Sequence, residues 1–306
     1  MRGPALIAGL LSFVAAGLLS GCATASGALT PLGRGRVIQV VAGENFWGSL
    51  ARQVGGSHVH VTSIIVNPAT DPHGYEPTAA DARAVASARL VIENGAGYDP
   101  WLPRLVAAGS GAQMVLDVGR LAGVANGANP HLWYRPADVR AFIGRLAADY
   151  ARIDPADAGY FARRRDYVQA VALRQYQELI SAIRTRYVGT RVGASESIFA
   201  MLAPSLGLRL STPPSFLRAV TEGTEPSVSD EQAIARQISR RLIKVYVYNS
   251  QNVTPDVQAQ LAAAGAAGIP VAVITETMVP AAGTFQGWQV RQLRGIEAAL
   301  ARATGH

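Results

Sequence analysis

The sequence predicts an α/β protein with two lobes, each containing a mostly parallel sheet flanked by helices, joined by one long rigid helix. Three observations support this fold class. Short apolar segments rich in β-branched residues alternate with segments of helical periodicity. About 270 of the 306 residues follow a low-complexity N-terminal region, which is more than one hydrophobic core usually accommodates. A stretch of about thirty residues with helical spacing separates the two halves.

The first half of the chain contains four predicted strands interleaved with helices. One predicted helix covers residues 46–53 and ends at Gly55-Gly56, and another has Thr78 as its N-cap and continues to Ala88. Strands that alternate with helices in this way favour a parallel sheet covered on both faces. The predicted strands are residues 36–42, 58–66, 90–92 and 113–118.

The second half repeats this pattern, with predicted strands at residues 190–194, 242–248 and 270–275. Helical stretches separate these strands, so a second parallel sheet is expected.

Residues 155–188 are predicted to connect the halves as a single helix. Apolar residues, among them Tyr167 and Val171, recur there at helical spacing, and Gly159 is the only glycine. Such a helix spans roughly 45 Å at 1.5 Å per residue, the full height of a small domain. A stiff strut is therefore expected between lobes at residues 36–154 and 189–306.

The first residues predict an export signal. The apolar run at residues 5–19 is too short for a comfortable membrane span and has the proportions of a signal peptide, assigned to residues 1–21. The motif Leu19-Ser20-Gly21-Cys22 resembles the lipobox of bacterial lipoproteins, in which the cysteine becomes a lipid-bearing N-terminus. Residues 22–35 are then a flexible tether lipidated at Cys22. An ordinary secreted protein with an unmodified cysteine is the alternative.

Composition excludes several classes of protein. Cys22 is the only cysteine, so a disulfide within the chain is impossible and a thiolate metal cluster is not expected. The net charge is +7, but the basic residues are spread through the predicted helices and form no aromatic-interleaved stripe. Nucleic-acid binding is therefore not expected.

Two histidines lie in proline-bounded loops, where regular secondary structure is unfavourable. His73 belongs to NPATDPHGYEPT, residues 67–78, and His131 belongs to NPHLWYRP, residues 129–136. Proline on both sides restricts the backbone and so reduces the entropy that ligand binding must overcome. Both loops are candidate binding loops.

Two glutamates directly follow predicted strands of the second half. Glu196 comes after the strand that ends at Ala194, and Glu276 comes after the strand that ends at Thr275. Ligands collect at the carboxyl ends of parallel strands, where loops converge. Two imidazoles and two carboxylates in a cleft between the lobes suit Zn²⁺, Mn²⁺ or Fe²⁺. Four protein ligands would leave no open position for a substrate, which favours holding an ion over catalysis.

Each of these residues also has an ordinary structural interpretation. A loop histidine is commonly a surface residue, Glu196 fits a first-turn acid that complements a helix dipole, and Glu276 fits a plain loop acid. No short spacing such as HExxH or CxxC links any two of them. Spacing alone therefore leaves the metal site undecided.

The motifs around these residues resemble the solute-binding proteins of ABC importers for zinc and manganese. The segment Asp71-Pro72-His73-Gly74-Tyr75-Glu76-Pro77-Thr78 is similar to the loop that supplies that family's first metal-binding histidine. Asn129-Pro130-His131-Leu132-Trp133 is similar to the second ligand loop, and Ser195-Glu196 and Thr275-Glu276 stand where the family places its last two ligands. The resemblance covers nearly the whole expected mature chain and implies four metal ligands: His73, His131, Glu196 and Glu276.

The chain departs from the family pattern at three places. Arg135 stands where an acid commonly precedes proline, and Glu276 stands where the last ligand is often aspartate, so another acid is an alternative fourth ligand. The segment LAGVANGAN, residues 121–129, lacks the histidine-rich acidic loop of many zinc importers. This leans against a dedicated zinc scavenger without excluding zinc.

Further residues are expected to surround the site. Four are predicted to wall the pocket, namely Asn45, Trp47, Tyr75 and Trp133, with a place in the core equally weighted for the two tryptophans. His58 and His60 alternate at the start of a predicted strand and so face the same way, as an accessory chelate or, preferably, an exposed strand edge.

The resemblance implies a monomeric, non-enzymatic receptor, exported and lipid-anchored to the outer face of the cytoplasmic membrane. It would capture Zn²⁺ or Mn²⁺, with Fe²⁺ also suitable, and deliver the ion to an ABC permease in the membrane. Metal affinity is expected to fall below about pH 6, because the imidazoles must be neutral to bind. The alternatives are an exported metallohydrolase that uses the same histidines with Glu76 as its base, and a metal-independent surface adhesin.

Overall fold

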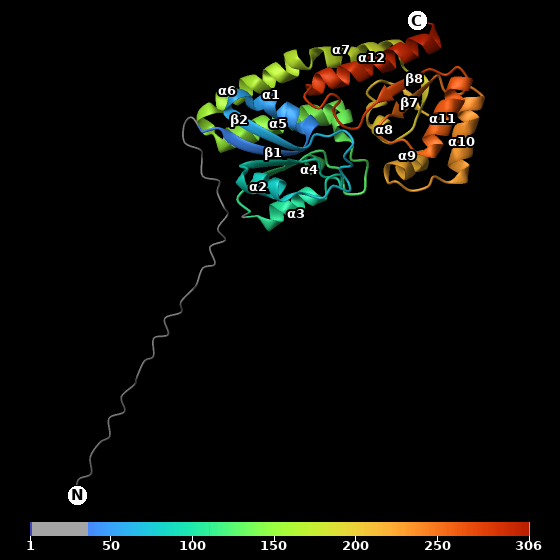
Figure 1. Cartoon of the computed structure of the whole chain (residues 1–306). Helices are drawn as coiled ribbons and strands as arrows, with labels where there is room; N and C mark the ends of the chain where they lie inside the picture. Colours follow the sequence, from blue (N-terminus) through green and yellow to red (C-terminus); the bar gives the residue numbers. More distant parts are fainter. Residues whose placement is uncertain (2–35, 110, 306) are drawn as a thin grey trace.

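The structure is a computed structural model that describes Met1, residues 36–109 and residues 111–305 (Figure 1). The predicted export signal, the tether and the lipidation site at Cys22 lie outside the described residues, apart from Met1. No helix within the described ranges is long and apolar enough to cross a membrane.

The N-terminal lobe contains a parallel sheet of four strands in the order β2-β1-β3-β4. All four predicted strands of the first half are confirmed within a few residues. Register pairs such as Val40 with Val61 and Val41 with Val91 place apolar side chains of neighbouring strands together. The strands are β1 (Ile38–Glu44), β2 (Val59–Ile65), β3 (Leu90–Glu93) and β4 (Met114–Asp117).

Helices cover both faces of this sheet, as the alternating pattern predicts. Thr78 caps α2 through a capping box, in which its side chain accepts from Asp81 N and Asp81 accepts from Thr78 N. Short 3₁₀ turns join several elements: η1 (Gly56–His58), η2 (Leu132–Tyr134) and η3 (Pro155–Asp157). The helices are α1 (Asn45–Gly55), α2 (Ala79–Ser87), α3 (Trp101–Ala108), α4 (Val118–Leu121) and α5 (Pro136–Ile153).

The predicted connecting helix is divided rather than continuous. It consists of α6 (Ala158–Tyr167), a π-helical turn η4 (Val168–Ala172) and α7 (Arg174–Tyr187). Leu173 N donates to Val168 O at 3.0 Å, a bond across five residues that widens the helix. The π-helical turn contains one residue more than a regular helical turn, and this places both Val168 and Leu173 on the buried face.

The π-helical turn also explains an error in the predicted apolar face. Tyr167 and Val171 were expected to contribute to that face, but about half of each side chain is exposed. A regular 3.6-residue repeat cannot anticipate the change of phase that a π-helical turn introduces.

The C-terminal lobe contains a second parallel sheet of four strands, in the order β6-β5-β7-β8. Three of its strands were predicted. The fourth, β6, was not, because a strand of two residues shows no detectable alternation of apolar and polar residues. The strands are β5 (Arg191–Ala194), β6 (Arg209–Leu210), β7 (Val245–Asn249) and β8 (Val271–Ile274). The helices are α8 (Ile198–Leu202), α9 (Pro214–Thr221), α10 (Val228–Ser239), α11 (Pro255–Ala266) and α12 (Phe285–Thr304).

One hydrophobic core runs through both lobes. Figure 1 shows α12 lying beside α7 along one side of the molecule, from the C-terminal lobe towards the N-terminal one. Phe46 of α1 stacks on Trp133 at 4.1 Å and lies 6.4 Å from Trp288 of α12 between ring centroids. These rings belong to a continuous buried cluster with members from both sheets. The shared core fixes the position of one lobe relative to the other.

Candidate metal centre

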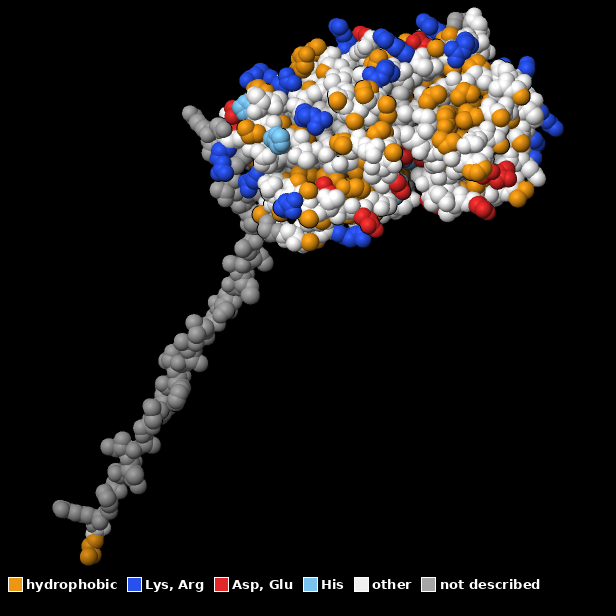
Figure 2. Space-filling view, in the orientation of Figure 1, with side chains coloured by type: hydrophobic (Ala, Val, Ile, Leu, Met, Phe, Trp, Pro, Cys, Tyr) orange, Lys and Arg blue, Asp and Glu red, His pale blue; other side chains and the backbone are white. Residues whose placement is uncertain are grey.

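The carboxyl ends of the two sheets face a common cavity of about 850 Å³. Loops from both lobes line it, and Figure 2 shows a notch between the lobes with acidic side chains at its edges. Among the predicted ligands, His73, Glu196 and Glu276 line this cavity directly, as do Asn129 and Pro130 of the His131 loop. The cavity is therefore where the predicted cleft was expected.

His131 lies at the bottom of this site, fully buried. Its Nδ1 is 2.8 Å from Oδ1 of Asn129, whose Nδ2 donates to the carbonyl of Ser197 at 2.7 Å. Because Asn129 Nδ2 donates to the carbonyl of Ser197, Asn129 Oδ1 faces the imidazole and accepts a hydrogen bond from Nδ1. The Nε2 atom is then unprotonated, and it has no hydrogen-bond partner among the described residues.

Glu196 follows β5 and reaches the same point from the C-terminal lobe. Its Oε2 accepts a hydrogen bond of 2.6 Å from Asn249 Nδ2, at the end of the neighbouring strand β7. Its Oε1 lies 3.9 Å from His131 Nε2. Asn249 thus fixes one carboxylate oxygen and leaves the other facing the imidazole.

Glu276 follows β8 and completes a group of three. Its Oε1 also lies 3.9 Å from His131 Nε2, and it accepts a hydrogen bond of 2.8 Å from the hydroxyl of Tyr98 in the N-terminal lobe. The backbone on either side is held by side-chain amides, since Thr277 N donates to Gln251 and Thr275 N donates to Gln292. One ligand atom from each of His131, Glu196 and Glu276 lies within 4.8 Å of the others.

The electrostatics of this group favour a bound cation. Burial, reinforced by the negative charge of Glu196, raises the pKa of Glu276 to about 7. Burial likewise raises the pKa of Glu196. Burial and, secondarily, the charge of His73 lower the pKa of His131 to about 3, so its imidazole is neutral. Within the described residues, no arginine or lysine forms an ion pair with Glu196 or Glu276. A divalent metal ion would supply the positive charge that these two buried carboxyl groups lack.

His73 lies in the cavity wall but outside this tight group. Its side chain is exposed, and its ring is 4.9 Å from the Tyr98 ring in an edge-to-face arrangement. The loop is held by Trp101 Nε1, which donates to the carbonyl of Pro72 at 3.1 Å, and by Asp71, which accepts from His73 N. The structure therefore brings three of the four predicted ligands together and places the fourth at the rim.

None of the four predicted wall residues lines the cavity, and for Trp47 and Trp133 the equally weighted alternative, a place in the core, holds. Trp47 and Trp133 are fully buried, because α1 and η2 turn them into the shared aromatic core. Asn45 is buried too, with its Oδ1 accepting from Met278 N, and Tyr75 packs on Trp101.

Trp47 nonetheless supports the site from behind. Its Nε1 donates to Asn94 Oδ1 at 3.0 Å, and Asn94 Nδ2 donates to the carbonyl of Pro130 at 2.9 Å. This chain of bonds fixes the residue before His131.

Two other predictions change with the structure. Glu76, the base required by the hydrolase alternative, is exposed and does not line the cavity. His58 and His60 do not share a strand face, because His58 ends the 3₁₀ turn η1 and only His60 lies in β2.

Sequence reasoning missed Tyr98, Asn129 and Asn249, which hold the three ligands through hydrogen bonds. Asn129 stands two residues before His131, and Asn249 directly follows the strand predicted at residues 242–248, so the sequence position of each was informative. Only the fold reveals the role of Tyr98, because its hydrogen-bond partner Glu276 is 178 residues away in the sequence.

The observed fold agrees with comparisons to known proteins. The sequence profile of the family described as zinc-uptake complex component A, periplasmic, matches residues 40–299. The chain belongs to this family.

Several curated relatives bear metal-binding names. A manganese-binding lipoprotein of Halalkalibacterium halodurans is 30% identical over 141 residues, an alignment that covers 44% of this chain and 46% of the relative. The chain thus spans less than half the length of that relative. A zinc-binding protein of Treponema pallidum is 23% identical over 313 residues, covering 94% of this chain and 97% of the relative.

Solved structures share the fold. The periplasmic zinc-binding protein of Treponema pallidum superposes with a TM-score of 0.70 at 19% identity, over 87% of this chain and 99% of that one. A cadmium-bound periplasmic metal-binding protein from Candidatus Liberibacter asiaticus also gives a TM-score of 0.70, at 18% identity and the same coverage.

Proposed function

We propose that this protein is an extracytoplasmic receptor that binds a divalent transition metal ion, Zn²⁺ or Mn²⁺, and delivers it to an ABC importer. The observation that carries the proposal is His131 Nε2, a buried atom without a partner that lies 3.9 Å from a carboxylate oxygen of both Glu196 and Glu276. Nitrogen and oxygen donors in this arrangement suit first-row divalent ions. Family membership supports the same conclusion.

The ligands in this proposal are His131, Glu196 and Glu276, joined by His73 from the rim. His73 lies on an exposed loop of the same cavity, so a modest movement of that loop would add a second imidazole. Four protein ligands would fill a tetrahedral shell and hold the ion without turnover. The ion is cargo, and Glu76 does not line the cavity, so it is not placed to act as a general base there.

Calorimetric titration of the full chain with Zn²⁺ and with Mn²⁺ tests the site. His131→Ala is expected to weaken the cavity affinity by about a hundredfold or more, because it removes the buried nitrogen donor. His60→Ala is the matched control, since His60 is an exposed histidine in β2. Equal dissociation constants for wild type and His131→Ala would contradict the proposal.

Membrane attachment through Cys22 and partnership with a permease form the second part of the proposal. They rest on the lipobox-like motif and on family membership. Cys22→Ser is expected to abolish labelling by a fatty acid and to move the protein from the membrane to the soluble fraction. Loss of cellular ⁶⁵Zn²⁺ or ⁵⁴Mn²⁺ uptake on deletion of the protein, restored by wild type but not by His131→Ala, would support delivery to an importer.

A further inference from the structure

A second group of potential metal ligands lies at the opposite end of the N-terminal lobe. His58 immediately precedes β2, whereas the cavity is lined by loops that follow the carboxyl end of that strand. Seven strand residues separate the two ends, a length of roughly 23 Å at 3.3 Å per residue. The second group is therefore separate from the proposed cargo site.

Three chain segments meet at this point. His58 Nδ1 lies 3.1 Å from Asp157 Oδ2, and a ligand atom from each of His58, Asp154 and Asp157 lies within 4.8 Å of the others. Asp154 is the C-cap residue that follows α5, and Asp157 lies in η3 and is the N-cap of α6. The group thus joins the sheet edge, the end of α5 and the start of the connecting segment.

Asp154 is the observation that points to a ligand. Its residue is 2% exposed, and its Oδ1 is shielded from solvent without a hydrogen-bond partner among the described residues. Burying such a group without a hydrogen-bond partner is unfavourable, because its desolvation is not compensated. In the part of the chain that the structure describes, no arginine or lysine forms an ion pair with Asp154 or Asp157.

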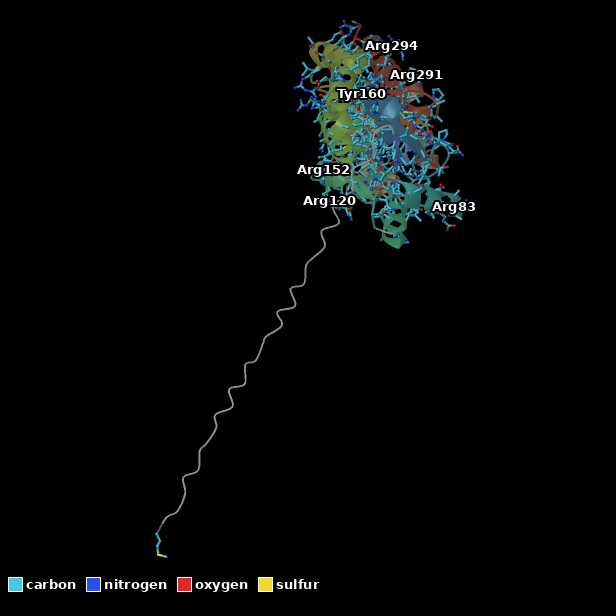
Figure 3. The ribbon with its side chains drawn as sticks, turned by 90° about the vertical axis from the view of Figure 1, so that its left-hand side faces the viewer. Arg83, Arg120, Arg152, Tyr160, Arg291 and Arg294 are labelled. Carbon is cyan, nitrogen blue, oxygen red and sulfur yellow. The ribbon has the colours of Figure 1, made fainter. Side chains whose placement is uncertain are left out.

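The imidazole of His58 is held in place by aromatic rings. Tyr160 lies 4.2 Å from it between ring centroids at 34°, and Phe161 lies 5.7 Å away edge-to-face. Figure 3 labels Tyr160 on α6, on the side of the molecule that faces the viewer. The side chains of His58 and Asp157 remain 30% and 36% exposed, which leaves a path for an ion and for water.

We propose that His58, Asp154 and Asp157 bind a second divalent first-row metal ion, with water completing the coordination shell. One imidazole nitrogen and two carboxylates are a donor set for Zn²⁺ or Mn²⁺. The ion would supply the positive partner that Asp154 lacks and would tie the start of α6 to the sheet. This site goes beyond the proposed cargo function and does not depend on it.

Zn²⁺ titration of the full chain tests this proposal by stoichiometry. Wild type is expected to bind two equivalents, and His131→Ala is expected to retain one. Adding Asp154→Asn, or separately His58→Gln, to His131→Ala is expected to weaken the remaining equivalent by about tenfold or more. Two different substitutions are used so that a folding defect in one does not decide the result. His60→Ala is the control and is expected to retain both equivalents.

The two proposals fail in different ways. One equivalent in wild type that disappears in His131→Ala would overturn the second site and leave the first intact. One equivalent that survives His131→Ala and is lost in Asp154→Asn would support the second site and contradict the first. A second equivalent that persists in both Asp154→Asn and His58→Gln would overturn the assignment of these ligands.

Discussion

The hydroxyl of Tyr98 in the N-terminal lobe donates a 2.8 Å hydrogen bond to Oε1 of Glu276 in the C-terminal lobe. The same oxygen faces His131 Nε2 at 3.9 Å. A neutral donor from one lobe therefore orients a proposed metal ligand of the other.

Tyr98→Phe tests this orientation. Without the hydroxyl, Glu276 is free to turn away from His131, so metal affinity is expected to fall by about tenfold. The ring remains, and with it the packing of Tyr98 against Trp133. Titration calorimetry measures the effect, and an affinity equal to that of wild type would show that the bond does not position Glu276.

Asn129 is expected to set the tautomer of His131. Asn129→Leu keeps a similar volume but removes the nearer partner of Nδ1 and leaves only Ser197 Oγ at 3.3 Å. The Nδ1-protonated tautomer is then less favoured, and a proton on Nε2 would block that atom as a ligand. A loss of about ten- to a hundredfold in metal affinity is expected. Asn126→Leu is the matched control, because Asn126 is exposed in the same loop. Equal losses in the two variants would contradict this role.

His73→Ala tests whether the histidine at the cavity rim contributes to metal binding in addition to the buried group of His131, Glu196 and Glu276. His73 is exposed, so its removal is expected to change the free energy of unfolding of the metal-free protein by less than about 0.5 kcal/mol. Metal affinity is expected to fall, because the fourth ligand is lost. Chemical denaturation without metal and calorimetry with metal give the two values. An unchanged dissociation constant would remove His73 from the ligand set.

Metal affinity is expected to rise with pH between about 5 and 8, but for a reason other than the histidine titration that the sequence suggested. The pKa of His131 is lowered to about 3, so this imidazole is already neutral throughout that range. Burial and the charge of Glu196 raise the pKa of Glu276 to about 7, so an incoming ion must displace a proton from Glu276 at lower pH. Calorimetry in buffers of different ionisation enthalpy counts the released protons. Glu276→Gln is expected to release fewer, and equal release would contradict the assignment.

The raised pKa of Glu276 also predicts the pH dependence of stability without metal. Its folded-state value of about 7 exceeds the ordinary value of 4.5, so the folded state binds the proton more tightly than the unfolded state does. The stabilisation that comes from protonated Glu276 is fully present below about pH 4.5 and is lost as the pH rises through 7. It amounts to roughly 3 kcal/mol. Urea denaturation at pH 5 and pH 8 measures it. Glu276→Gln is expected to flatten the dependence, and an unaltered slope would contradict it.

Most of the fold was predictable because alternating apolar strands and helices leave a strong periodic signal. β6 was not predicted because it has only two residues. The break in the connecting helix near Leu173 was not predicted because a π-helical turn depends on tertiary packing rather than on a sequence period. The ends of the strands located Glu196 and Glu276 correctly beside the cavity.

The surroundings of the site were harder to predict. Trp47 and Trp133 have both an apolar body and a polar nitrogen, and only the packing of α1 against η2 decides that they face the core. The partners of Tyr98 and His58 lie 178 and about one hundred residues away, and such contacts leave no local pattern.

The stack of Phe46, Trp133 and Trp288 limits how far the two lobes can move relative to one another. A large hinge motion that separates the lobes would expose the aromatic core that they share. The free-energy cost would be roughly 25 cal/mol for each Å² of apolar surface exposed. Small displacements of loops at the cavity rim, such as the loop that contains His73, would cost far less free energy. Under the proposed function, a docking transporter would therefore have to distinguish the metal-bound protein from the metal-free protein by the conformation of a few surface loops.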